Sequence, residues 1–397
     1  MKNKQMLLTA NKEAVIELIR TKGPINRAMI ARLTGLSIPT IMKITDDFIQ
    51  AGLVRSIGKG ESTGGKKPDM LEFIEDAYYI IGVDLGRHRK NVILMDMAGR
   101  IIKRNQEIVS EDEIQNPQVY IKCIAKMISA CLKYAEEIGK PILGIGVGIA
   151  GIVDEQKQVN VFSADFGWNN VKVVQQLKEY FDLPIAMENS NRTMALGEKW
   201  FGAGKDCNYI FCVNWGYGIG AAILEEGSLL QGYNGSSGEF GHLTLEKDGP
   251  LCDCGNRGCL EALSSGNAIA KQMRKILRQR NCMAEADMEN VQADDVFTFM
   301  KQGDKAAEKI IWEAVEYMGI GIAGSINLLD PNMIVLSGGI TKSKEIYHSY
   351  LMETIEKHRM RNAGTKVKVC YGHLGENASA IGAATLILKN LIEKGGN

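Results

Sequence analysis

The stretch NYIFCVNWGYGIGAAILEEGSLL, residues 208–230, combines an apolar strand, a glycine-rich turn and a second strand that runs back. Residues 77–102, AYYIIGVDLGRHRKNVILMDMAGRII, have the same plan. Strands over 141–151 and 331–339 also end in glycine turns, and apolar spacing predicts a helix over 116–138. Such turns let backbone N–H groups approach a ligand, although Gly is also usual in any tight turn. The repetition predicts two related α/β lobes with a cleft between them.

The residues before this repeat follow a helical pattern. The segment KEAVIELIRTK, residues 12–22, predicts an amphipathic helix that Gly23-Pro24 terminates. Asn26 is suited to cap a second helix, and Gly35 to make the turn that ends it. The spacing predicts that the second helix buries three apolar residues, which are Met29, Ile30 and Leu33.

A third helix is predicted from Ser37 to Gln50, with Pro39 tolerated in its first turn. Its buried stripe consists of Ile41, Ile44 and Phe48. Two short strands, 53–57 and 70–73, enclose a loop rich in glycine and lysine. This order is typical of a winged helix-turn-helix that places its third helix in the DNA major groove.

The charge distribution agrees with DNA binding by this segment. Residues 1–70 hold 12 Lys or Arg against 6 Asp or Glu, although the whole chain is neutral. The candidate contacts to bases and phosphates are Ser37, Thr40 and Lys43 on the helix, and Lys66 and Lys67 in the wing. The alternative is a three-helix interaction module whose basic surface has no such role.

Composition places the chain among folded globular proteins. Its 397 residues suffice for two or three domains, and 45% of them are apolar. No apolar run approaches the roughly 20 residues that span a bilayer. The N-terminus lacks the apolar core of a signal peptide, and nine cysteines fit a reducing compartment. We therefore expect a cytoplasmic protein without membrane contact.

Three of the nine cysteines lie within eight residues of GHLTLEKDGPLCDCGNRGCLEA, residues 241–262. Thiolate and imidazole ligands suit tetrahedral zinc. The predicted ligands are His242, Cys252, Cys254 and Cys259, and four protein ligands make one structural zinc per chain. Buried free thiols or a disulfide are the alternatives, of which the disulfide is disfavoured in the cytoplasm.

Two carboxylates flank this cluster. Glu239 precedes His242 by three residues, and Glu261 follows Cys259 by two. Carboxylates and an imidazole with a free N–H suit sugar hydroxyls, which both donate and accept hydrogen bonds. Each glutamate alone is equally compatible with a solvated surface.

The segment GYNGSSGEFGHLTLEKDGPLCDCGNRGCLEAL, residues 232–263, resembles the signature of the ROK family of repressors, open reading frames and kinases, and the resemblance covers nearly the whole chain. It implies a winged helix-turn-helix (1–75) and a two-lobed, actin-like and ribonuclease H-like α/β body. The first lobe would comprise 76–195 plus 378–397, and the second 196–377. The family's zinc ligands match the four predicted here, and its sugar-binding residues fall on Asn189, Glu239, His242 and Glu261.

The resemblance also shows what this chain lacks. The family's kinases carry a general-base Asp where MENSNRTMALGEKW has Ser190. Their phosphate loops carry small or hydroxyl residues where this chain has Arg87, His88 and Tyr217. A serine hydroxyl does not accept a proton near neutral pH, and loss of a general base typically costs about 10²–10⁴ in rate. We therefore predict no catalytic residue and no kinase activity.

Together these features predict a sugar-responsive transcriptional regulator, most readily a repressor of carbohydrate genes. Its partners would be operator DNA, a sugar and a second copy of the chain, with a tetramer as the alternative assembly. A pentose, a hexose or a hexosamine, free or phosphorylated, satisfies the predicted site. The runner-up function is an ATP-dependent sugar kinase with an appended DNA-binding domain. A third is a DNA-binding protein that responds to another protein or to a phosphosugar.

Overall fold

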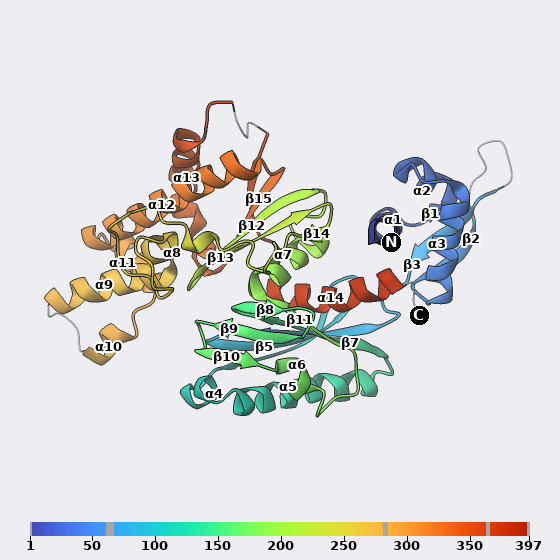
Figure 1. Ribbon diagram of the computed structural model, residues 1–397, viewed down its shortest axis with the longest axis horizontal. Helices are drawn as coiled ribbons and strands as arrows, with labels where there is room; N and C mark the ends of the chain where they lie inside the picture. The colour runs from blue at the N-terminus through green and yellow to red at the C-terminus, as the bar shows by residue number, and fades with distance from the viewer. Residues whose placement is uncertain (1, 61–66, 281–284, 363–365, 395–397) are drawn as a thin grey trace.

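The computed structural model describes residues 2–60, 67–280, 285–362 and 366–394 (Figure 1). The N-terminal module consists of three helices and a small sheet of strand order β1-β3-β2. Its elements are α1 (Lys2–Lys22), β1 (Ile25–Asn26), α2 (Arg27–Thr34), α3 (Ile38–Gln50), β2 (Val54–Lys59) and β3 (Asp69–Phe73). The antiparallel pair β2–β3 corresponds to the two strands predicted over 53–57 and 70–73.

Local sequence signals set the helix boundaries of this module. The Asn26 side chain accepts the Met29 N–H, and the Ser37 side chain accepts the Thr40 N–H, so both residues are N-caps as predicted. Gly35 ends α2 in the left-handed conformation, with φ 71°. Ile30, together with the predicted stripe of α3, is buried.

The predicted inward positions of Met29 and Leu33 are wrong, since these side chains are 36% and 45% exposed. The short helix α2 packs against the module with the face that carries Ile30 and Ala31. Successive helical residues are turned by about 100°, so Met29 and Leu33 lie beyond Ile30, on the side of the helix away from Ala31.

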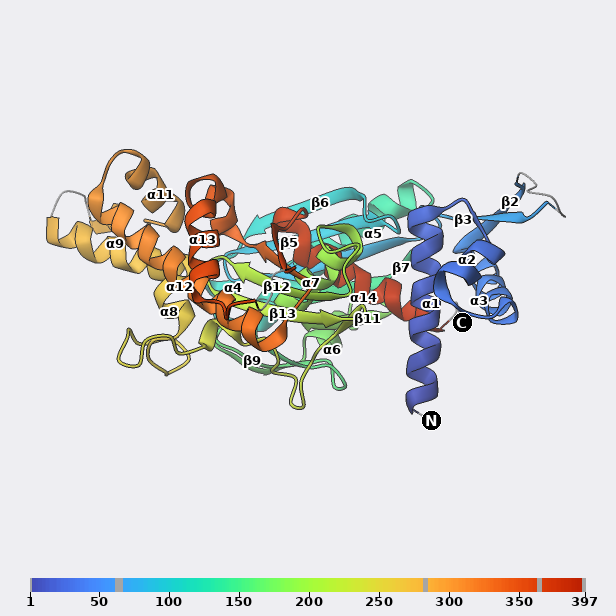
Figure 2. The ribbon, with the colours of Figure 1, turned by 90° about the horizontal axis from the view of Figure 1, so that it is seen from above.

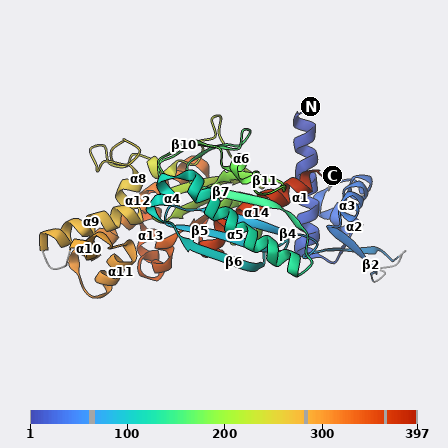
Figure 3. The ribbon, with the colours of Figure 1, turned by 90° about the horizontal axis from the view of Figure 1, so that it is seen from below.

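The first lobe is built on a five-stranded sheet of order β11-β7-β4-β5-β6. Its strands are β4 (Tyr79–Leu85), β5 (Arg89–Asp96), β6 (Ile101–Ile108), β7 (Ile142–Ile149) and β11 (Ile185–Asn189), and a small sheet of β8 (Ile152–Asp154), β9 (Val159–Ser163) and β10 (Trp168–Val171) adjoins it. Side chains alternate between the two faces of β4. Ile81 and Val83 pack against α5 (Pro117–Glu137), which crosses the sheet in Figure 3, whereas Ile80 faces α14 (Ala378–Lys394). The shorter helices α4 (Glu111–Gln115) and α6 (Val173–Leu177) complete this lobe.

The second lobe repeats this plan. Its sheet has the order β14-β13-β12-β15-β16, in which an antiparallel hairpin, β12–β13, lies beside a parallel strand, β15. The strands are β12 (Tyr209–Trp215), β13 (Ile219–Glu225), β14 (Ser228–Leu229), β15 (Met333–Ser337) and β16 (Lys368–Tyr371). The helices are α8 (Leu260–Ser264), α9 (Gly266–Arg280), α10 (Glu285–Glu289), α11 (Ala293–Lys301), α12 (Lys305–Leu329) and α13 (Lys344–His358). The predicted strand–turn–return repeat is therefore confirmed.

Two helices lie between the sheets, α7 (Ser190–Phe201) and α14. One apolar cluster contains side chains of α1, α7, α14 and both sheets, including Ile19, Ala195, Cys212 and Ile387. The boundaries expected for the three domains stay a prediction. No described helix combines the length and the apolar character needed to cross a membrane.

The approach of α14 to the first sheet requires glycine. A Cβ on Gly146 of β7 would lie 1.8 Å from the Ala383 carbonyl oxygen. We expect Gly146→Ala to lower the free energy of unfolding by about 1–3 kcal/mol or more, because backbone has to move to accept the methyl group. Urea denaturation measures this loss. Gly324→Ala is the control: its added Cβ on α12 meets no atom within 4 Å, so stability should stay or rise by up to about 1 kcal/mol.

Candidate functional site

A cleft of about 1670 Å³ lies between the two sheets. The first lobe contributes the end of β4 and the turn after it, with Asp84 and Gly86. The second lobe contributes the turn between β12 and β13, with Gly216 and Gly218. The glycine turns that the sequence pairs thus face one cavity from both lobes.

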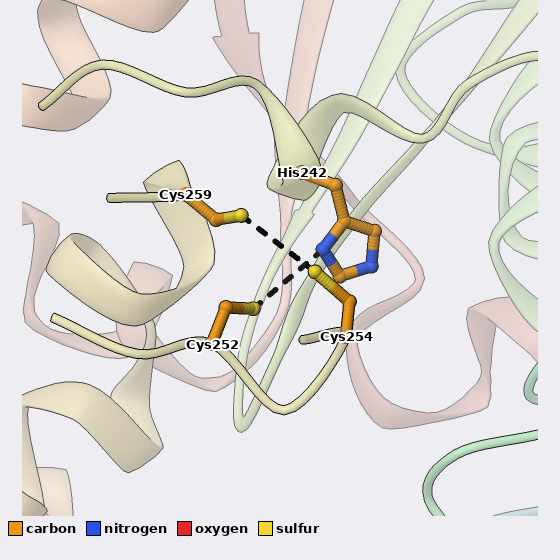
Figure 4. A group of neighbouring side chains, drawn as sticks. All are labelled: His242, Cys252, Cys254 and Cys259. Carbon is orange, nitrogen blue, oxygen red and sulfur yellow. Dashed lines mark hydrogen bonds between the residues drawn. The ribbon is translucent and has the colours of Figure 1, made fainter. Parts of the chain in front are cut away.

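The cysteine-rich loop lines one wall of this cleft, and its candidate ligands point toward one another in Figure 4. One ligand atom from each of His242, Cys252, Cys254 and Cys259 lies within 4.8 Å of all the others. The Cys254 and Cys259 sulfurs are 3.7 Å apart, and His242 Nδ1 is 3.8 Å from the Cys252 sulfur. Tetrahedral zinc with bonds of about 2.0–2.3 Å needs ligand separations of roughly 3.5–3.8 Å, so these four residues fit such an ion.

The backbone brings these ligands together through short bridges. Thr244 pairs with Cys259, and Leu251 pairs with Arg257. Gly258 adopts φ 67° and passes so close to Glu246 that a Cβ there would lie 1.6 Å from its carbonyl oxygen. Burial raises the pKa of the Cys252 thiol to about 12. A metal that binds here would displace the proton of the Cys252 thiol.

The three predicted sugar-binding residues of the second lobe converge beside the metal loop, and all line the cleft. Glu239 Oε2 lies 3.8 Å from His242 Nε2, on the ring edge opposite the atom that faces the cysteines. The Glu261 carboxylate accepts the Ile219 N–H at 2.7 Å. The His242 imidazole thus lies between the cysteine cluster and the Glu239 carboxylate.

The predicted sugar contact from the first lobe is Asn189, which lines the same cleft. Its side chain also makes two hydrogen bonds within the protein. Its side-chain oxygen caps α7 by accepting the Asn191 N–H at 2.8 Å, and its amide group donates to the Gly151 carbonyl at 2.8 Å. These bonds fix its orientation at the start of α7.

Comparison with known proteins identifies this two-lobed arrangement. Residues 80–390 match the model of the ROK family. The chain belongs to the ROK family. The xylose repressor of Caldicellulosiruptor bescii is 28% identical over 99% of this chain and 98% of its own. The N-acetylglucosamine repressor of Escherichia coli O157:H7 is 28% identical over 98% and 95%.

Solved ROK structures share the fold. A ROK-family transcriptional regulator, described as a homolog of the E. coli MLC protein, has a TM-score of 0.81 at 24% identity and covers 98% of both chains. The ROK glucokinase of Streptomyces griseus, solved with glucose and AMPPNP, has a TM-score of 0.66 at 26% identity. It covers 78% of this chain and 98% of its own.

A buried arginine that the sequence did not single out joins the two sides of this ROK cleft. Arg192, on the first turn of α7, is 5% exposed and pairs with Glu188 at 3.4 Å. Its Nη2 donates to the carbonyls of Gln231, Gly235 and Ser237, at 3.3, 2.6 and 3.3 Å. Arg192 thereby holds the loop that leads to Glu239. One indication of this role was present in the sequence, which is a strongly basic residue three positions after Asn189.

Bulky side chains meet where the two glycine turns of the cleft face each other. The rings of His88 and Tyr217 meet edge to face, with centroids 4.5 Å apart, and the Arg87 guanidinium donates to the Asp165 carbonyl. Desolvation and Arg87 lower the pKa of His88, which favours a neutral ring. Burial raises the pKa of Asp84 to about 6, although the Ser379 hydroxyl donates to it at 2.7 Å.

The candidate DNA contacts lie on the N-terminal module. Lys43 and Lys67 are exposed, whereas the Ser37 hydroxyl is 2.8 Å from the Thr40 hydroxyl at the start of α3. Lys66 lies outside the described residues.

We expect purified protein to contain one equivalent of zinc, measured by elemental analysis. Cys254→Ala removes a ligand from the cluster and should release most of the metal. Cys123→Ala is the matched control, because that thiol lies on α5, outside the cluster. Well under one equivalent in the unmodified protein, or full zinc in Cys254→Ala, would contradict the assignment.

Proposed function

We propose that this ROK protein is a sugar-responsive transcriptional repressor that binds DNA as a dimer through its N-terminal module. The main support is the likeness to xylose and N-acetylglucosamine repressors over 98–99% of the chain. A sugar in the cleft would contact Asn189, Glu239, His242 and Glu261. The zinc ligands would fix the wall that carries His242, and sugar would release the operator by changing the spacing of the paired modules.

The same cleft is poorly equipped for phosphoryl transfer. Ser190 lines it at the start of α7, where the family's kinases have their general base, and its hydroxyl is not basic enough for that task. The side chains of His88 and Tyr217 meet between the turns that would cradle nucleotide phosphates. Phosphoryl transfer depends on positioning and charge neutralisation. Ser190→Asp alone should therefore not create a kinase.

Sugar-dependent release of DNA tests this proposal. An operator duplex is first selected by the protein from a random-sequence library. D-xylose or N-acetyl-D-glucosamine should then lower its affinity in fluorescence anisotropy, without consuming ATP. Glu239→Ala and Glu261→Ala should each abolish release but leave operator affinity unchanged, because they remove groups in the cleft only. Glu308→Ala, which removes an exposed carboxylate paired with Lys305 on α12, is the control.

Two outcomes would overturn this function. Sugar-dependent ADP formation at roughly 1–100 per second would establish the runner-up, a sugar kinase with a DNA-binding domain. Operator binding that neither sugar nor its phosphate changes would favour a protein effector instead.

The N-terminal module makes a separate prediction about DNA. Lys43→Ala and Lys67→Ala should weaken operator binding and flatten its salt dependence, since each lost phosphate contact changes the log–log slope by roughly 0.9. Anisotropy titrations at several salt concentrations measure that slope. Lys305→Ala, on α12 of the second lobe, is the charge-matched control. An unchanged slope in both module variants would show that these lysines do not contact phosphates.

A further inference from the structure

The cleft and the N-terminal module are connected by the same two helices. Both α7 and α14 begin in the cleft, where Ser190 and Ser379 line its wall. The far end of α14 packs against α1, toward which it runs in Figure 2, and the far end of α7 meets Arg20 of α1. A displacement of either helix at the sugar site therefore reaches the module directly.

Close packing makes α7 and α14 one rigid unit. A Cβ on Gly382 of α14 would lie 1.5 Å from the Thr193 carbonyl oxygen, and one on Gly197 of α7 would lie 2.6 Å from that of Ala378. The Thr193 and Ser379 hydroxyls are also 3.0 Å apart. Backbones in such contact have no side-chain layer that could yield between them, so the helices move together.

The end of α7 contacts α1 through Arg20. Its guanidinium lies 5.5 Å from the Trp200 ring and 5.2 Å from the Phe201 ring, and donates to the Trp200 carbonyl at 2.9 Å. Glu17 orients it at 2.8 Å, and the Arg20 side chain is only 9% exposed. Cation–π contacts are stronger when the cation is desolvated, so Arg20 attaches the end of α7 firmly to α1.

The end of α14 makes a second attachment. Lys389 and Glu13 pair at 2.9 Å with side chains that are each 15% exposed. The neighbouring Lys12 donates to the Glu393 carbonyl at 3.3 Å and lies 3.9 Å from Asp47 of α3. This contact continues from α14 through α1 to the helix that we assign to the major groove.

We infer that α7 and α14 transmit sugar binding to the DNA-binding module as one rigid unit, through Arg20 and Glu13. This inference rests on the proposed function and identifies how the sugar site is coupled to DNA. Two sites coupled in this way affect each other equally, so operator binding weakens sugar binding by the same factor.

Variants at the attachments test the inference in the full chain. Operator affinity is measured by anisotropy with and without saturating D-xylose or N-acetyl-D-glucosamine, and sugar affinity by calorimetry. We expect sugar to lower operator affinity about 5–150-fold in the unmodified protein, as in typical allosteric coupling. In Arg20→Ala and in the isosteric Glu13→Gln this factor should fall at least threefold, while each ligand alone binds as before.

Arg278→Ala serves as the matched control, because it removes an Arg–Glu pair between α9 and α10, at the opposite end of the molecule from α1. It should keep the full factor. If Arg20→Ala proves unstable, Glu13→Gln, which removes only a charge, decides alone. Unchanged coupling in every folded attachment variant would overturn the inference and leave the proposed function intact. No sugar effect in the unmodified protein would instead overturn the proposed function, and the inference with it.

Discussion

Backbone-to-backbone contact around α14 is the constraint on which this architecture depends. Gly82 and Gly146 let the helix touch the first sheet, and Gly197 and Gly382 let it touch α7. A methyl group at any of these points would meet a carbonyl oxygen or backbone nitrogen at 3.0 Å or less. The lobes are consequently joined by a thin, stiff layer, and the shape of the cleft is set by that layer as much as by either sheet.

Sequence reasoning succeeded where the signals are local. The caps at Asn26 and Ser37 and the hairpin turns depend on neighbouring residues, and each appears where predicted. The four candidate metal ligands lie within 18 residues, so their spacing alone indicated a cluster. Met29 and Leu33 were misplaced because apolar character does not tell which side of a short helix meets its neighbours.

The remaining features depend on contacts between distant segments. Arg192 holds carbonyls about 40 residues away, and Arg20 meets Trp200 across 180 residues. Periodicity cannot reveal such partners, because each arginine alone is equally consistent with a solvated surface. The contact of His88 with Tyr217 is similar: the sequence showed two bulky residues in separate glycine turns, but not that they meet.

The way in which Arg192 holds its loop has a consequence for the design of biosensors. The guanidinium binds the loop through main-chain carbonyls, and Tyr233 in the middle of it is fully exposed. The loop's path is thus largely independent of the side chains at Tyr233, Asn234 and Ser236. A library randomised at these positions can alter the exposed surface of this loop without removing the hydrogen bonds that Arg192 makes to its carbonyls. The exposed side chains of this loop are therefore open to engineering, whereas Arg192 has to be kept.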